Sequence, residues 1–72
     1  MDDSVYNVIE LIGTSTESWE AAAKSAVETA AQSLEDIRVA EVVKMDLRLE
    51  NNKVAQYRTK VMVSFKYHKP LV

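Results

Sequence analysis

The chain has 72 residues, no cysteine, one histidine and a formal net charge of −2, which excludes disulfide frameworks, thiolate zinc sites, cysteine catalysis and clusters of histidine ligands. The charge balance lacks the basic field of a nucleic-acid-binding protein, no apolar run reaches the ~18 residues of a membrane span, and the acidic N-terminus has no signal-peptide pattern. We therefore expect one cytoplasmic domain over residues 1–72 that binds neither nucleic acid nor a membrane.

The first predicted element is a strand over Val5–Ile12, followed by a turn over Gly13–Thr16. The turn is predicted because it holds the only glycine of the chain together with small polar residues. Thr14 and Glu17 have the spacing of a capping box at the start of a helix, and Ser15 is an alternative N-cap. A helix is therefore expected directly after this turn.

Helical spacing extends from about Ser18 to Leu34. The apolar positions recur at intervals of three and four and fall on one stripe, which consists of Trp19, Ala22, Ala23, Ala26, Val27, Ala30 and Leu34. Because most of this stripe is alanine, the helix axis can approach its neighbour closely. We expect Trp19 to be a hydrophobic anchor of the helix; a ligand-stacking role is the alternative.

Residues 37–67 predict one long β-hairpin, because apolar residues alternate with polar ones over both halves of the segment. Typical strands run about 5–6 residues, so these two are too long to be covered by their own small chain. Chains below roughly 70–80 residues usually need disulfides, a metal or oligomerisation for stability. Since cysteine is absent and histidine scarce, we predict a homo-oligomer.

The turn of this hairpin must keep apolar residues opposite apolar ones. A two-residue turn at Asn51 and Asn52 would place Leu47 opposite Gln56, which a half-buried sheet penalises. One additional residue, in the loop or as a bulge, places Leu47 opposite Tyr57 instead.

We predict that this additional residue lies in a three-residue loop, Asn51–Lys53, with one asparagine in the left-handed region. The same register places Val43 opposite Val61. On the polar face it places Asp46 opposite Arg58, which is a favourable pair of opposite charges.

Two charged residues of the hairpin are candidate functional groups. Glu41 interrupts the apolar face, so its carboxylate is predicted to be buried and paired at an interface with a neighbouring subunit; cation binding or a functional pKa is the alternative. Arg58 lies on the polar face beside Gln56 and Lys60. It is expected either to be solvated or to face a cavity, where it meets Asp46 or an anionic ligand.

No set of catalytic residues is indicated. The serines have no histidine near them in sequence, since His68 is the only histidine. Gly13 stands alone and cannot form a phosphate-binding loop, and no acidic run has the spacing of an EF-hand. We therefore expect the protein not to be an enzyme.

The order and spacing of several segments resemble the dodecin family. These segments are Tyr6–Glu10, Ile12–Ser15, Trp19–Ala22, Val39–Val43, Tyr57–Thr59, and the alternating Val61, Val63 and Phe65. The resemblance implies an α+β subunit of order β-α-β-β, in which a three-stranded antiparallel sheet wraps around one helix. It also implies that twelve such subunits form a hollow shell.

Two positions depart from the flavin-binding members of that family. Their flavin-stacking tryptophan corresponds to Val39, and the glutamine that holds the flavin corresponds to Arg58. The resemblance therefore points to the calcium dodecin branch, which lacks this tryptophan, although it assigns no metal ligands here. We expect a shell that binds, stores or buffers a small ligand or a cation, with Glu41 and Asp46 in its polar interior or interfaces. Flavin binding in an altered pose and a purely structural or protein-binding assembly are the alternatives.

Overall fold

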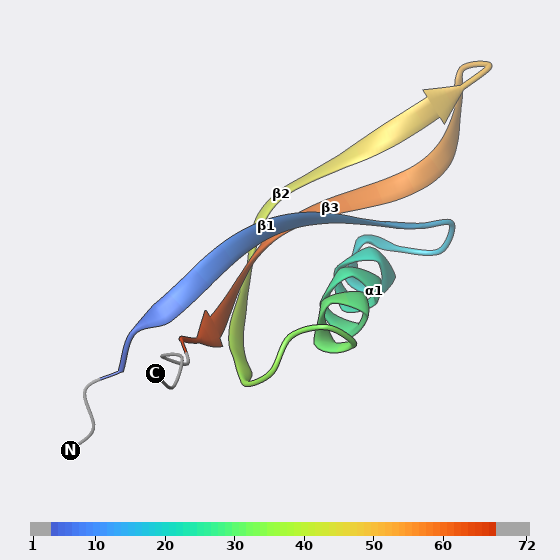
Figure 1. The fold of residues 1–72 in the computed structure, drawn as a ribbon. Helices are drawn as coiled ribbons and strands as arrows, with labels where there is room; N and C mark the ends of the chain where they lie inside the picture. Colours follow the sequence, from blue (N-terminus) through green and yellow to red (C-terminus); the bar gives the residue numbers. More distant parts are fainter. Residues whose placement is uncertain (1–3, 68–72) are drawn as a thin grey trace.

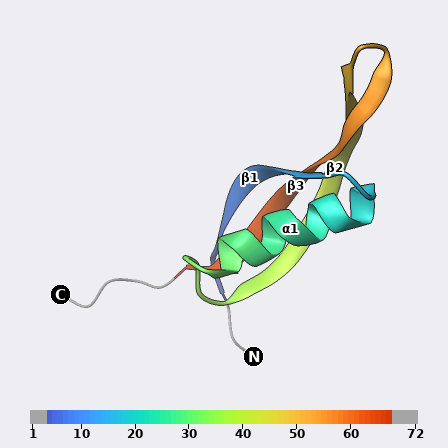
Figure 2. The same ribbon diagram turned by 90° about the vertical axis from the view of Figure 1, so that its right-hand side faces the viewer.

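The computed structural model describes residues 4–67, and its secondary structure follows the predicted order. The elements are β1 (Tyr6–Ser15), α1 (Trp19–Ala31), β2 (Ile37–Glu50) and β3 (Lys53–Lys66). The strands form one antiparallel sheet of order β1-β3-β2, and α1 lies against one face of it (Figures 1 and 2). The predicted β-α-β-β subunit is confirmed.

The first strand continues three residues beyond its predicted end. Gly13 and Ser15 lie in β1 and pair with Thr59 and Tyr57, so the turn predicted at Gly13–Thr16 is wrong. A Cβ atom on Gly13 would clash with the carbonyl oxygen of Ala22 and would lie 3.0 Å from the Cβ of Ala26. The glycine is therefore required by the close approach of the helix rather than by a turn.

The helix begins at Trp19, four residues later than a capping box at Thr14 and Glu17 would place it. Ser18 is the N-cap, and its Oγ accepts a hydrogen bond of 3.0 Å from the N–H of Ala21. Ser15 instead accepts a hydrogen bond of 2.9 Å from the N–H of Glu17, which closes the turn before the helix. The Thr14–Glu17 capping box is wrong because Thr14 is still part of the paired strand.

The helix contributes alanines to a very small core. It ends at Ala31 rather than near Leu34, and Leu34 lies half-buried in the turn that follows. The buried residues of the described chain, besides Gly13, are Ala22, Ala26, Ala30, Thr59, Val61 and Val63. The alanine stripe thus packs on β1 and on β3, the central strand of the sheet.

The hairpin turn is shorter than predicted. Glu50 pairs with Lys53, so only Asn51 and Asn52 form the turn. Both asparagines have positive φ, 52° and 62°, as a two-residue type I′ turn requires. The additional residue is Ala55, which is left out of the pairing as a β-bulge. The predicted three-residue loop is therefore wrong. The bulge at Ala55 instead restores the pairing of apolar residues with apolar residues.

The register that this additional residue was expected to produce is confirmed in the middle of the hairpin. Leu47 faces Tyr57 and Asp46 faces Arg58, as predicted. Leu47 therefore points to the same side of the sheet as the helix, and Asp46 points away from it. We call the side away from α1 the outer face.

A second bulge, at Val43, reverses this parity along β2. Val42, not Val43, faces Val61, and Glu41 faces Met62 on the outer face. Glu41 is exposed in the subunit, so its predicted burial on the apolar face is wrong. One unpaired residue moves the side chains that follow it to the opposite face, until the register shifts again at Arg38.

The hairpin extends beyond the rest of the subunit. Because β1 ends opposite Tyr57, residues 48–56 form a two-stranded arm that projects past the helix (Figure 1). Leu49 and Val54 face each other on this arm and are 60% and 50% exposed. The arm therefore presents apolar surface that its own chain does not cover.

Within residues 4–67, the helix is neither long nor apolar enough to cross a membrane.

Candidate functional site

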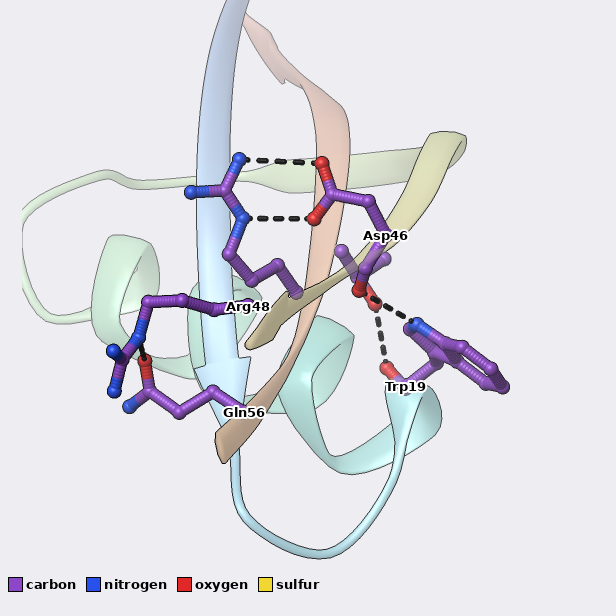
Figure 3. Close-up of polar contacts among 6 residues, drawn as sticks. Trp19, Asp46, Arg48 and Gln56 are labelled. Atoms are coloured by element: carbon purple, nitrogen blue, oxygen red, sulfur yellow. Dashed lines mark hydrogen bonds and ion pairs between the residues drawn. The ribbon is translucent and has the colours of Figure 1, made fainter. Parts of the chain in front are cut away.

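The central polar contact of the outer face joins β2 to β3. Arg58 donates two hydrogen bonds to Asp46, from Nε to Oδ1 at 2.7 Å and from Nη2 to Oδ2 at 3.2 Å (Figure 3). The two side chains are 39% and 37% exposed. Such a bidentate guanidinium–carboxylate pair combines charge with defined geometry. The two hydrogen bonds fix the side chains of Asp46 and Arg58 in place on neighbouring strands.

This contact changes the acidity of both groups. The hydrogen bond from Arg58 lowers the pKa of Asp46 below its ordinary value of 3.8, and the nearby charges of Arg58, Lys44 and Lys60 act in the same direction. Partial burial opposes the shift. The hydrogen bond to Asp46 raises the pKa of Arg58 in turn. The pair is therefore fully charged at neutral pH.

The pair should make stability depend on pH in the acidic range. Because the pKa of Asp46 is lower in the folded than in the unfolded chain, the pair stabilises the fold above about pH 4 and loses this effect as the pH falls through the folded pKa. We expect Asp46→Asn to lower the thermal midpoint at neutral pH, with the difference from wild type shrinking on acidification. Thermal denaturation at a series of pH values measures this. Glu35→Gln, which removes one carboxylate from an exposed position, is the control and should keep nearly the wild-type thermal midpoint at neutral pH; a loss as large as that of Asp46→Asn would contradict the prediction.

Trp19 connects the start of the helix to the base of the arm. Its Nε1 donates to the main-chain oxygen of Asp46 at 3.1 Å (Figure 3), and its ring meets Tyr57 edge-on with centroids 5.1 Å apart. Thr59, only 1% exposed, donates from Oγ1 to the main-chain oxygen of Trp19 at 2.9 Å. Trp19 is thus an anchor, as expected. In the sequence, Thr59 stands out only as a hydroxyl-bearing residue on an otherwise apolar face of its strand.

Val39, the other position that the resemblance assigned to the flavin pocket, lies far from the Asp46–Arg58 pair. Val39 is opposite Ser64 on the outer face and is 58% exposed. It lies on the same strand as Asp46, seven residues away, which corresponds to roughly 20 Å along the strand. A pocket that includes both Val39 and Arg58 therefore requires more than one copy of the chain.

Within residues 4–67 of one subunit, the side chains do not form a complete calcium site, and those at Val39 and Arg58 cannot stack on a flavin. Calcium takes 6–8 oxygen ligands, and residues 4–67 contain no group of three or more acidic or histidine side chains placed to hold a metal ion. Both carboxylate oxygens of Asp46 are already bonded to Arg58. No aromatic side chain stands at Val39 or Arg58 to stack on a flavin, and Trp19 is held in the contacts described above.

These features define a class of protein: a small α+β subunit with one helix on one face of its sheet and an apolar arm left uncovered. The chain belongs to the dodecin family, whose model, described as Dodecin, matches residues 5–68. It is 51% identical over 63 residues to the protein named calcium dodecin from Mycobacterium tuberculosis, covering 88% of this chain and 89% of that protein.

Solved dodecin structures have the same fold. The crystal structure of calcium dodecin from Mycobacterium tuberculosis, described as having a novel calcium-binding site, is 48% identical with a TM-score of 0.82 and covers 94% of this chain and 100% of that one. Dodecin from Streptomyces coelicolor is 27% identical with a TM-score of 0.91, covering 97% and 100%. The likeness to calcium dodecin therefore extends to sequence as well as to fold.

Proposed function

We propose that this protein is a non-enzymatic dodecin that assembles into a hollow shell, of twelve copies in the family's pattern, and binds and buffers a small ligand or cation, with calcium as the favoured ion. The observation that carries the proposal is the 51% identity to calcium dodecin over nearly the whole chain. Val39 and Arg58 support it, because they stand where flavin-binding dodecins have a tryptophan and a glutamine.

Self-assembly is supported by the balance between core and exposed apolar surface. The buried hydrophobic core of the described chain consists of three alanines and two valines. Many larger apolar side chains are more than 40% exposed, among them Val42, Met45 and Leu49. A monomer rarely exposes this much contiguous apolar surface. Neighbouring copies would cover it.

Calcium would then bind between copies rather than within one. An exposed carboxylate on the outer face, such as Glu41, can combine with carboxylates of neighbouring copies, whereas a single subunit supplies too few oxygens. This arrangement keeps Glu41 as the candidate for a subunit interface.

Assembly makes a prediction for the apolar arm. We expect the purified protein to have a native mass many times the 8.1 kDa of one chain. Leu49→Asp places a charge on the exposed arm and should shift the mass to single chains or small species, because burying an unpaired charge at an interface is costly. Native mass spectrometry gives both results. Glu50→Gln, at the adjacent position of the arm, should assemble normally; a single-chain mass for the wild type would contradict the proposal.

Calcium titration tests the proposed ligand. After treatment with a chelator, the wild type should bind Ca²⁺ in isothermal titration calorimetry, and Glu41→Gln should bind it at least about tenfold more weakly, or about 1.4 kcal/mol less favourably. Glu28→Gln, on the exposed side of the helix, should bind like the wild type. Riboflavin fluorescence should remain unquenched in all three proteins. Quenching without calcium binding would instead favour a flavin dodecin.

A further inference from the structure

Two lysines face each other across the outer face of the sheet. Lys44 of β2 and Lys60 of β3 are direct cross-strand partners. Like charges in this position destabilise a sheet. Lys60 is partly compensated from β1 by Glu10, whose Oε1 lies 3.7 Å from its Nζ. Within residues 4–67, Lys44 forms no ion pair within 4 Å.

These lysines line a small cavity next to the Asp46–Arg58 pair. The cavity has a volume of about 80 Å³ and is lined by Ile12, Lys44, Asp46, Arg58 and Lys60. Its lining carries three positive side chains and one negative. The carboxylate of Asp46 has both oxygens hydrogen-bonded to Arg58 and attracts the two lysines without an ion pair to either, so one negative charge is shared among three positive side chains.

The donors around the cavity suit a compact oxyanion. Arg58 uses two of its five N–H groups on Asp46, and each lysine carries three N–H donors. The excess of positive charge is local, because the whole chain has a net charge of −2. A small anion placed between the lysines would relieve their repulsion and accept hydrogen bonds from strands β2 and β3 together.

We propose that this cavity binds a phosphate group, through Lys44, Lys60 and Arg58. The site goes beyond the proposed cation binding and does not depend on it, because no calcium ligand is required. The phosphate can be free phosphate or the monoester end of a larger molecule, since both present the same oxygens to the lysines.

The test uses the assembled protein in calcium-free, low-salt buffer at neutral pH. Inorganic phosphate and phenyl phosphate are titrated by calorimetry into the wild type, Lys44→Gln, Lys44→Arg and Lys53→Gln. The wild type should bind phosphate, Lys44→Gln at least about tenfold more weakly, and Lys44→Arg comparably to the wild type. Lys53→Gln removes the same charge at the exposed tip of the arm and should bind like the wild type. Equal affinity for both probes indicates free phosphate, and tighter binding of phenyl phosphate indicates a larger ligand.

Two results would overturn the site. The first is a wild type that binds neither probe, which is also the result expected when a carboxylate of a neighbouring copy occupies the lysines. The second is equal weakening in Lys44→Gln and Lys53→Gln, which means that only overall charge matters. Native mass spectrometry of each variant shows that it is assembled. Calcium binding is titrated separately without phosphate, so failure of this site is distinct from failure of the proposed function.

Discussion

Replacing Gly13 with alanine should lower the free energy of unfolding by about 3 kcal/mol, at the upper end of the effects known for overpacked sites. The new Cβ would meet main-chain atoms of the helix, with the carbonyl carbon of Ala22 at 2.9 Å and the Cβ of Ala26 at 3.0 Å. Neither group is the flexible end of a side chain. The helix would have to move away from β1, and with it the three alanines of the buried hydrophobic core.

Circular dichroism during chemical denaturation measures this effect at a fixed protein concentration, since assembly makes stability depend on concentration. Thr14→Ala is the matched control, because Thr14 is the next residue of the same strand and is exposed. Similar stability of the two variants would show that the helix does not lie as close to β1 as described.

Replacing Trp19 with alanine should lower the free energy of unfolding by roughly 3 kcal/mol, the order found for large aromatic side chains removed from packed positions. The change removes the hydrogen bond to the main-chain oxygen of Asp46 and the edge-on contact with Tyr57. Trp19→Phe keeps a ring but not the N–H donor, so its cost should be about 1 kcal/mol.

Thr16→Ala is the control for this pair of variants, because Thr16 is exposed in the loop that precedes the helix. The only tryptophan is lost in both Trp19 variants, so far-ultraviolet circular dichroism is the readout. If Trp19→Ala is as stable as Thr16→Ala, the indole ring does not contribute to the free energy of unfolding, and its role as an anchor is wrong.

The two substitutions test how the arm and helix are held in a subunit with little core. Gly13 allows the helix to lie directly on the sheet, and Trp19 ties the start of the helix to β2 through Asp46. Asp46 is bonded by its side chain to Arg58 on the opposite side of the sheet. Asp46 therefore takes part both in the contacts of the helix and in those of the outer face. A ligand bound on the outer face beside Asp46 would contact β2, the strand to which Trp19 is hydrogen-bonded.

Much of the fold followed from patterns that are local in sequence. Alternation of apolar and polar residues determined the two long strands, since successive side chains of a strand point to opposite faces. The alanine stripe determined which side of the helix is buried. The requirement that Asp46 face Arg58 followed from matching apolar residues across the hairpin. The resemblance to dodecins identified the family, and it implied that Val39 and Arg58 depart from the flavin-binding pattern.

Only the tertiary structure decided where the additional residues of the sheet lie. The bulges at Ala55 and Val43 leave one residue unpaired each, and each one exchanges the two faces until the next shift in register. For this reason Glu41 is exposed on the outer face rather than buried. The pairing of Lys44 with Lys60, by contrast, continues the register of the Asp46–Arg58 pair, which the matching of apolar residues had already predicted. Sequence alone determined which residues could form a site, and the three-dimensional register decided which of them meet.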